Sequence, residues 1–272
     1  MLLNNYRSII ISFIGNNKTA SRIYSFVKRL FESLKFIAKR TRFVIFGNKV
    51  SDIKEIPIVI NNYNRLEYLK LLIESLEVRG YTNIHILDNK STYPPLLEYY
   101  KTCKYHVILL GENLGYCALW KSNVFNKFKH GFYVYTDSDM QIDIDCPDDF
   151  MDEFMEIMNK HFFAQKVGFG LRIDDLPDSF KNKTSVIDWE KQYWKPLGST
   201  NRYFKAKIDT TFALYRPYCY GPSVGYKEMY RTNFPYVIKH LPWYVNSDNL
   251  SEEEHYYIDS ITQSTHWSIQ SK

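Results

Sequence analysis

Between residues 56 and 136 the chain alternates short apolar runs with stretches of helical periodicity. The apolar runs are rich in β-branched, aromatic and other large side chains and have the length of buried strands: 56–60, 83–88, 106–110 and 132–136. Leucine and isoleucine recur at helical spacing after the first run, and a second helix is expected over 116–128. The order strand, helix, strand, strand, helix, strand predicts an α/β fold with a Rossmann-like, mostly parallel sheet flanked by helices.

The pattern continues less regularly after residue 145. A helix is expected to begin near Pro147, and strands are expected at 166–172 and 208–216. Residues 173–207 are rich in aromatic side chains without a clear period, which fits either a loop that binds an acceptor or ordinary packing. Ser251 and Glu254 have the spacing of a capping box and predict the start of a last helix.

Residues 1–51 are expected to form a basic, helical appendage to a domain at 52–272. From about Ser21, apolar side chains recur in one helical stripe: Ile23, Phe26, Val27, Leu30, Phe31, Leu34 and Ile37. Residues 1–50 carry ten Lys or Arg against one acid, a net charge of +9, so the rest of the chain carries −4 of the total +5. Such a helix suits an anionic membrane surface. It equally suits docking on the domain or on a second subunit, which would make the protein a homo-oligomer.

Charge and cysteine usage narrow the class of protein. Because the basic charge is confined to the N-terminal segment, a nucleic-acid-binding groove spread over the domain is not expected. Four cysteines without paired spacing, and no recognisable signal peptide, favour reduced thiols in the cytoplasm. No run of apolar residues is long enough for a membrane-spanning helix. The 23 Tyr and 18 Phe fit a surface that contacts sugars, bases or lipid headgroups, and they also fit core packing.

Two aspartates stand where the run at 132–136 ends. Asp137 and Asp139 are one residue apart, so their side chains point the same way on an extended backbone. Two such carboxylates repel each other unless a cation lies between them, and Mg²⁺ or Mn²⁺ would take their oxygens together with those of a diphosphate. The alternative is a solvated acidic loop. A second triplet, Asp143–Asp145, is less suited because no comparable strand precedes it.

Four short motifs occur in order around these strands: 56–65, 87–91, 112–115 and 136–139. In sequence and spacing the chain resembles GT-A-type glycosyltransferases, most of all the family 2 enzymes of surface-polysaccharide assembly. The resemblance covers about residues 56–145, which would be the nucleotide-binding half, and leaves 146–272 as the acceptor half. It implies a GT-A-type fold and a nucleotide-sugar donor.

The resemblance also implies roles for individual residues. Asn62 and Tyr63, after the first strand, would hold the nucleoside, and Asp88, after the second, would contact the base. Asn113, in the third motif, would belong to the donor site, and Asp137 and Asp139 would hold Mn²⁺ or Mg²⁺ on the diphosphate. The loop at 61–64 departs from the shorter run of small residues with Arg or Lys that many relatives have.

In the C-terminal half, the resemblance suggests further ligands. GT-A enzymes often use a C-terminal histidine as an extra metal ligand, for which His240 is the first candidate and His266 the second. The alternative for His240, which lies beside Pro and Trp, is a structural role. Asp209 at the start of the run at 208–216 could contact sugar hydroxyls, and Arg216 at its end could contact phosphate; the alternatives are a turn cap and a surface residue.

Transfer to a hydroxyl needs a general base, because a sugar hydroxyl must lose its proton as it attacks. In inverting GT-A enzymes this base is an acid at the start of a helix after the acceptor region, and the stretch at 249–257 resembles that position. Glu253 or Glu252 is therefore the first choice and Asp209 the second. Capping explains Glu254 but does not explain its two neighbours.

Together these features predict a metal-dependent glycosyltransferase of the hexosyltransferase type. It would move a sugar from a nucleoside diphosphate, expected to be UDP, to a hydroxyl of a glycan or lipid-linked acceptor with inversion. If the appendage binds lipid, the enzyme would be peripheral at the cytoplasmic face of the membrane. Two alternatives stay open: a sugar nucleotidyltransferase and a non-catalytic glycan-binding protein at the membrane surface. The loop at 61–64 argues against the nucleotidyltransferase because it lacks Gly and basic residues.

Overall fold

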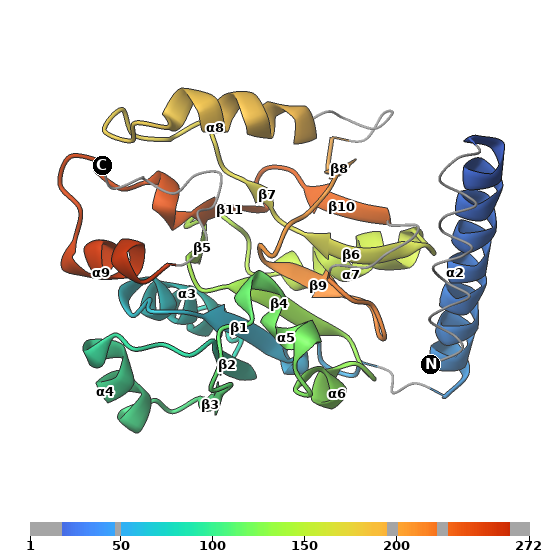
Figure 1. The fold of residues 1–272 in the computed structure, drawn as a ribbon, viewed down its shortest axis with the longest axis horizontal. Coiled ribbons are helices and arrows are strands. Elements are labelled where there is room, and N and C mark those ends of the chain that lie inside the picture. Colours follow the sequence, from blue (N-terminus) through green and yellow to red (C-terminus); the bar gives the residue numbers. More distant parts are fainter. Residues whose placement is uncertain (1–17, 47–49, 195–200, 222–227, 262–272) are drawn as a thin grey trace. The chain divides into compact units, whose positions relative to one another are not determined.

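The computed structural model describes residues 18–46, 50–194, 201–221 and 228–261 (Figure 1). The chain divides into two compact units. One comprises residues 1–48 with 223–227, and the other comprises 49–222 with 228–272. Each unit is described by itself.

The described part of the first unit is one long helix, α2 (Lys18–Phe46). The predicted apolar stripe is exposed along it, with Phe26 65% and Leu34 56% accessible to solvent. Arg22, Lys28 and Arg29 are exposed as well. Among the described residues, no helix combines the length and the apolar character needed to cross a membrane.

An eight-stranded sheet in the order β3-β2-β1-β4-β9-β6-β10-β8 forms the centre of the second unit. All neighbours from β3 to β4 pair in parallel, and so do β6 and β10, whereas β9 and the edge strand β8 run antiparallel to their neighbours. The predicted mostly parallel α/β sheet is therefore confirmed. The strands are β1 (Ile58–Asn62), β2 (Ile84–Asp88), β3 (His106–Leu109), β4 (Tyr133–Asp137), β6 (Ala164–Gly168), β8 (Tyr203–Lys205), β9 (Ala213–Tyr215) and β10 (Glu228–Thr232).

A small second sheet follows the carboxyl end of β4. Its strands are β5 (Met140–Ile142), β11 (Val237–His240) and β7 (Gly170–Leu171), with β11 in the middle. β5 begins directly after Asp139 and pairs antiparallel with β11, so that Met140 lies opposite His240. This sheet therefore brings a distant segment to the end of β4.

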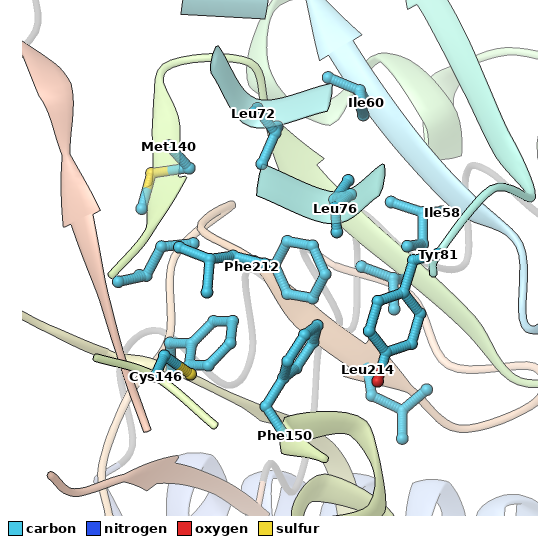
Figure 2. Close-up of a cluster of buried hydrophobic side chains, with 14 of the residues drawn as sticks. Ile58, Ile60, Leu72, Leu76, Tyr81, Met140, Cys146, Phe150, Phe212 and Leu214 are labelled. Carbon is cyan, nitrogen blue, oxygen red and sulfur yellow. The ribbon is translucent and has the colours of Figure 1, made fainter. Parts of the chain in front are cut away.

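Helices cover both faces of the large sheet, because successive residues of its buried strands point to opposite sides. On one face Ile58 and Ile60 pack with Leu72 and Leu76 of α3 and with Phe150 of α7 (Figure 2). On the other face Val59 packs with the helices α5 and α6. The helices are α3 (Glu67–Glu77), α4 (Pro94–Thr102), α5 (Ala118–Lys121), α6 (Phe125–Phe128), α7 (Phe150–Lys160), α8 (Lys183–Glu190) and α9 (Glu252–Ser260).

Three predicted elements differ from the structure. The helix expected over 116–128 is two short helices, since the backbone is extended at Ser122. The strand expected over 208–216 pairs only at 213–215, because the Thr210 side chain and carbonyl turn instead to the end of β4. The strand expected over 166–172 is split at Phe169 between the two sheets.

Candidate functional site

The carboxyl ends of β1, β2 and β4 lie side by side in one row of polar side chains. The parallel register places Asn62 opposite Asp88 and Asn61 opposite Asp137. Ligands of open α/β sheets bind beyond this edge of the strands. This row of polar side chains defines the candidate site.

Asp137 is held by hydrogen bonds from both of its neighbours in the sheet. Asn61 Nδ2 donates to Oδ1 at 3.1 Å, and the Thr210 hydroxyl donates to Oδ2. The Asp137 amide also donates to the Thr210 carbonyl at 3.0 Å. Burial, and then the nearby charge of Asp139, raise the pKa of Asp137 to about 7 despite these hydrogen bonds. Ionising both aspartates without a cation is thus unfavourable.

Asp139 lies beside His240, as the pairing of β5 with β11 requires. His240 Nε2 is 3.4 Å from Asp139 Oδ2, and the imidazole packs against the Trp243 ring. Burial alone would raise the pKa of Asp139, but the charge and hydrogen bond of His240, together with the charge of Arg65, lower it below its usual value. Asp139 Oδ1 is buried and has no hydrogen-bond partner in the described part of the chain.

These residues fit a hard divalent cation. Asp139 Oδ1 is an oxygen ligand without a partner among the described residues, and a cation there would relieve the repulsion that raises the Asp137 pKa. Within residues 18–261, outside the undescribed gaps, no three His, Cys, Asp or Glu side chains form a ready-made metal cluster. A Mg²⁺ or Mn²⁺ ion held by one or two carboxylates would therefore take its other oxygens from water and a bound phosphate.

The predicted nucleoside residues Asn62 and Asp88 are buried and share one tyrosine. Tyr100 of α4 donates to Asp88 Oδ1 at 3.1 Å and accepts from Asn62 Nδ2 at 2.8 Å. The Ser91 amide donates to Asp88 Oδ2 at 3.0 Å, which fixes the turn after β2. The structure places both predicted residues at the site, and it adds Tyr100, which the sequence reasoning missed because α4 was not predicted.

Tyr63 and Asn64 connect the loop after β1 to the end of α9. The Tyr63 hydroxyl donates to the Ser260 carbonyl at 2.9 Å, and Asn64 Nδ2 donates to Ser260 Oγ at 2.9 Å. Asn64 Oδ1 also accepts from the amides of Thr92 and Tyr93, while its own φ is 52°. Asn64 therefore joins three segments of the site. The sequence pattern does not single it out, although asparagine tolerates the left-handed backbone conformation that this turn requires.

Asn113 lies on the loop after β3 and is exposed. Its Oδ1 accepts from the Gly115 amide at 2.9 Å, which closes a local turn where Gly115 has a φ of 70°. Asn89, at the end of β2, binds the same loop through the Leu114 amide. The donor-site role of Asn113 stays a prediction, whereas its contact in the structure is a turn cap.

The acids at the start of α9 hold the start of α3. Glu253 Oε2 accepts from the amides of Leu66 and Glu67 at 2.7 and 2.9 Å, and the side chain is buried. Burial raises the pKa of Glu253 in spite of these two bonds. Glu253 thus caps the neighbouring helix α3. The sequence predicts a catalytic base at this position and does not predict the capping contact. Glu252, the other predicted base, is exposed at the first position of α9.

Half of the predicted capping box of α9 is confirmed, since the Glu254 amide donates to Ser251 Oγ at 3.2 Å. The Glu254 carboxylate, however, does not return to the helix start. It binds the Arg65 guanidinium, with Nη1 2.8 Å from Oε1 and Nη2 3.0 Å from Oε2, and it accepts from the Tyr68 hydroxyl. Sequence reasoning missed this cluster because its members are far apart in the chain.

Asp209 is the exposed carboxylate next to the aspartate pair. It precedes Thr210, whose hydroxyl holds Asp137, and its charge contributes to the raised pKa of Asp137. Asp209 Oδ1 accepts from the Thr210 amide at 3.0 Å, and buried Lys166 Nζ donates to the Asp209 carbonyl at 2.9 Å. The structure therefore brings this predicted residue to the site with its carboxylate facing solvent.

Arg216 is not part of this site, and the prediction that it contacts phosphate is wrong. Because β9 runs antiparallel to β4, with Tyr215 opposite Tyr133, Arg216 lies beyond the amino end of β4. It is buried, with Nε donating to the Ala164 carbonyl at 2.7 Å and Nη2 to the Met158 carbonyl at 2.6 Å. Its task is to bind carbonyls around the end of α7.

The second aspartate triplet is structural, although the strand β5 ends directly before Asp143, where the sequence pattern predicts no strand. Asp143 is buried, and its Oδ2 lies 2.7 Å from Nη1 of Arg172. Its Oδ1 accepts from the Asp145 amide at 3.0 Å. His266, the second candidate for the metal, lies outside the described residues.

Comparison with known proteins gives similarities to solved structures only. No family model matches the chain, and no curated protein matches it. The crystal structure of S. aureus TarS 1–349 is 13% identical over 69% of this chain and 60% of that chain, with a TM-score of 0.40. Glucosyl-3-phosphoglycerate synthase from Mycobacterium tuberculosis, in complex with phosphoglyceric acid, is 14% identical over 62% of each chain, with a TM-score of 0.39. The chain thus spans about three fifths of the length of these proteins.

Proposed function

We propose that this protein is a metal-dependent glycosyltransferase that takes a sugar from a nucleoside diphosphate, namely UDP. The observation that carries the proposal is the row of Asn62, Asp88, Asn61 and Asp137 at the carboxyl edge of the sheet, continued by Asp139. A buried polar pair for a nucleoside and, beside it, two carboxylates for a metal and diphosphate are what a nucleotide-sugar donor needs. The resemblance of the four sequence motifs supports the same class.

In this proposal each part of the row has one task. Asn62 and Asp88, with Tyr100, bind the nucleoside, and Asp139, with Asp137, holds Mn²⁺ or Mg²⁺. A bound divalent ion would supply positive charge to the departing diphosphate. Asn61 and Thr210 orient the Asp137 carboxylate. His240 orients the Asp139 carboxylate or is itself a ligand of the metal ion. The M. tuberculosis synthase has itself been crystallised with Mn²⁺ and UDP-glucose.

We assign the general base to Asp209 rather than to Glu253. A base must reach the acceptor hydroxyl, and the exposed Asp209 carboxylate lies next to the residue that holds Asp137. Glu253 is buried against the start of α3, and one of its oxygens already accepts two amide hydrogen bonds. Transfer would be to a hydroxyl of a glycan or lipid-linked glycan, with inversion.

Calorimetric titration with UDP tests the proposed class of donor. With Mn²⁺ present we expect UDP to bind at least about tenfold more tightly than after chelation, because the diphosphate and the two carboxylates share the ion. A panel of nucleotide sugars, scored for hydrolysis with Mn²⁺, then identifies the sugar. No binding of any nucleoside diphosphate contradicts the proposal, and release of pyrophosphate from a nucleoside triphosphate and a sugar phosphate would instead indicate a nucleotidyltransferase.

We also propose that α2 holds the enzyme at an anionic membrane surface. Its apolar stripe is exposed, with Phe26, Leu30 and Leu34 each more than half accessible, and exposed cations lie beside the stripe. Apolar side chains inserted at the headgroup boundary and cations on lipid phosphates are the two contacts of an interfacial helix. Because anionic lipids are concentrated in the cytoplasmic leaflet, the proposed site of action is its surface.

Vesicle co-sedimentation of the full chain tests this membrane contact. We expect binding to vesicles with anionic lipid, weaker binding to neutral vesicles and release at high salt. Phe26→Ser with Leu30→Ser should lower binding at least about 100-fold, since two buried apolar side chains worth about 1.5 kcal/mol or more each are lost. Lys28→Gln with Arg29→Gln should lower it less, by about 1 kcal/mol per charge. Equal sedimentation of all variants contradicts the proposal and favours docking on protein.

A further inference from the structure

Arg65 is a buried cation at the carboxyl edge of the sheet, in the loop that follows β1. Its side chain is 5% exposed. The Glu254 carboxylate binds the two terminal nitrogens, and the guanidinium carbon lies 3.6 Å from the centre of the Tyr257 ring and 4.9 Å from that of Tyr68. Glu254 and Tyr257 both belong to α9, whose start lies beside α3 (Figure 1). These contacts hold the guanidinium in one orientation.

The same guanidinium has buried hydrogen-bond donors that the described residues do not use. Arg65 Nε has no acceptor among the described residues, although it is buried. Of the five N–H donors of the guanidinium, the hydrogen bond to Glu254 comes from Nη2, whereas Nη1 pairs with Glu254 by charge at 2.8 Å and has no hydrogen-bond partner among the described residues. Arg65 follows the end of β1 by three residues, and Asn61 at that strand end donates to Asp137, so the guanidinium belongs to the same edge of the sheet as the aspartates.

A fixed cation is needed at this edge because the site is otherwise acidic. Asp137, Asp139 and Asp209 repel a diphosphate, and a single divalent ion offsets only part of that charge. Arginine suits phosphate better than lysine does, because its planar fork matches two phosphate oxygens. A guanidinium already oriented by Glu254 and two rings loses little further freedom when a phosphate binds.

We infer that Arg65 binds the diphosphate of the donor and that Glu254 and Tyr257 are positioning residues that orient its guanidinium. This inference rests on the proposed use of a nucleoside diphosphate. It assigns α9, which belongs to the acceptor half of the chain, a part in donor binding. Glu254 at the same time offsets some of the Arg65 charge when no donor is bound.

The test compares UDP with uridine, in the presence of Mn²⁺, by calorimetry on the full chain. The key variant is Arg65→Gln with Glu254→Gln, which removes both charges and leaves two amide side chains that can hydrogen-bond to each other. Its matched control is Glu254→Gln alone, which leaves the Arg65 charge. Thermal unfolding of each variant shows whether the fold is kept.

We expect the double variant to bind UDP at least about tenfold more weakly than the native chain, with uridine affinity unchanged, because only the phosphate contact is lost. Glu254→Gln should bind UDP more weakly than the native chain and more tightly than the double variant, because the Arg65 charge remains while its guanidinium loses part of its orientation. Arg65→Lys, which keeps the charge without the fork, should give an intermediate UDP affinity and provides the same comparison if the double variant does not fold.

Equal UDP affinity of the native chain, the double variant and Arg65→Lys overturns the inference, because Arg65 would then only pair with Glu254. Parallel losses of UDP and uridine affinity overturn it too, since the effect would be structural. If the native chain binds uridine and UDP equally, no phosphate contact exists and the inference is wrong. If it binds neither, the proposed function itself has failed, which is a distinguishable result.

Discussion

Replacing Asp139 by Asn is expected to abolish metal-dependent donor binding and to lower turnover at least about 100-fold, while the protein stays folded. Asp139 Oδ1 is the buried carboxylate oxygen of the site that lacks a partner among the described residues, and it is therefore the first ligand for an incoming ion. Asparagine keeps the shape and can still accept from His240. Removing one of two repelling carboxylates also lowers the Asp137 pKa from about 7 toward its ordinary value.

The measurement is calorimetry with UDP, with and without Mn²⁺, together with nucleotide-sugar hydrolysis. Asp145→Asn is the matched control. Asp145 belongs to the second triplet, its side chain is exposed, and only its backbone amide contacts Asp143. It should behave as the native chain does. UDP binding that remains metal-dependent in Asp139→Asn would remove Asp139 from the proposed metal site.

The sequence predicted the fold of residues 56–145 because this part of the chain follows local rules. The buried strands β1, β2 and β4 are apolar runs, and each ends in polar residues, so their order along the chain was enough to bring Asn62, Asp88 and Asp137 to one edge. The amphipathic stripe predicted α2 in the same way, and the Ser251 cap predicted α9.

The rest of the site depends on contacts between distant segments, which local patterns do not encode. Thr210 reaches Asp137 from 73 residues away and Glu254 reaches Arg65 from 189 residues away. Arg216 was misplaced for a related reason: its position depends on the direction of β9, and an antiparallel strand inserted in a parallel sheet carries its last residue to the opposite edge. Periodicity shows that a strand exists and does not show which way it runs.

Replacing Asp209 by Asn is expected to lower the rate of nucleotide-sugar hydrolysis or transfer by about 10²- to 10⁴-fold, the usual contribution of a general base. UDP affinity should stay within about twofold of the native value, because no donor contact is removed. The substitution is conservative: the Thr210 amide can donate to the asparagine oxygen as it does to Asp209 Oδ1, and the backbone carbonyl still accepts from Lys166.

Two acids of α9 provide the comparison that decides between candidate bases. Glu252→Gln changes an exposed side chain and should leave both rate and stability unchanged. Glu253→Gln should keep the fold and most of the activity, because its amide oxygen can still accept from the amides of Leu66 and Glu67 and the cost of burying a carboxylate is removed. An active Asp209→Asn beside an inactive but folded Glu253→Gln would return the role of base to α9. An inactive Asp209→Asn beside an active Glu253→Gln would place the acceptor hydroxyl next to Asp209 and Thr210. A base must lie within hydrogen-bond reach of the proton that it removes.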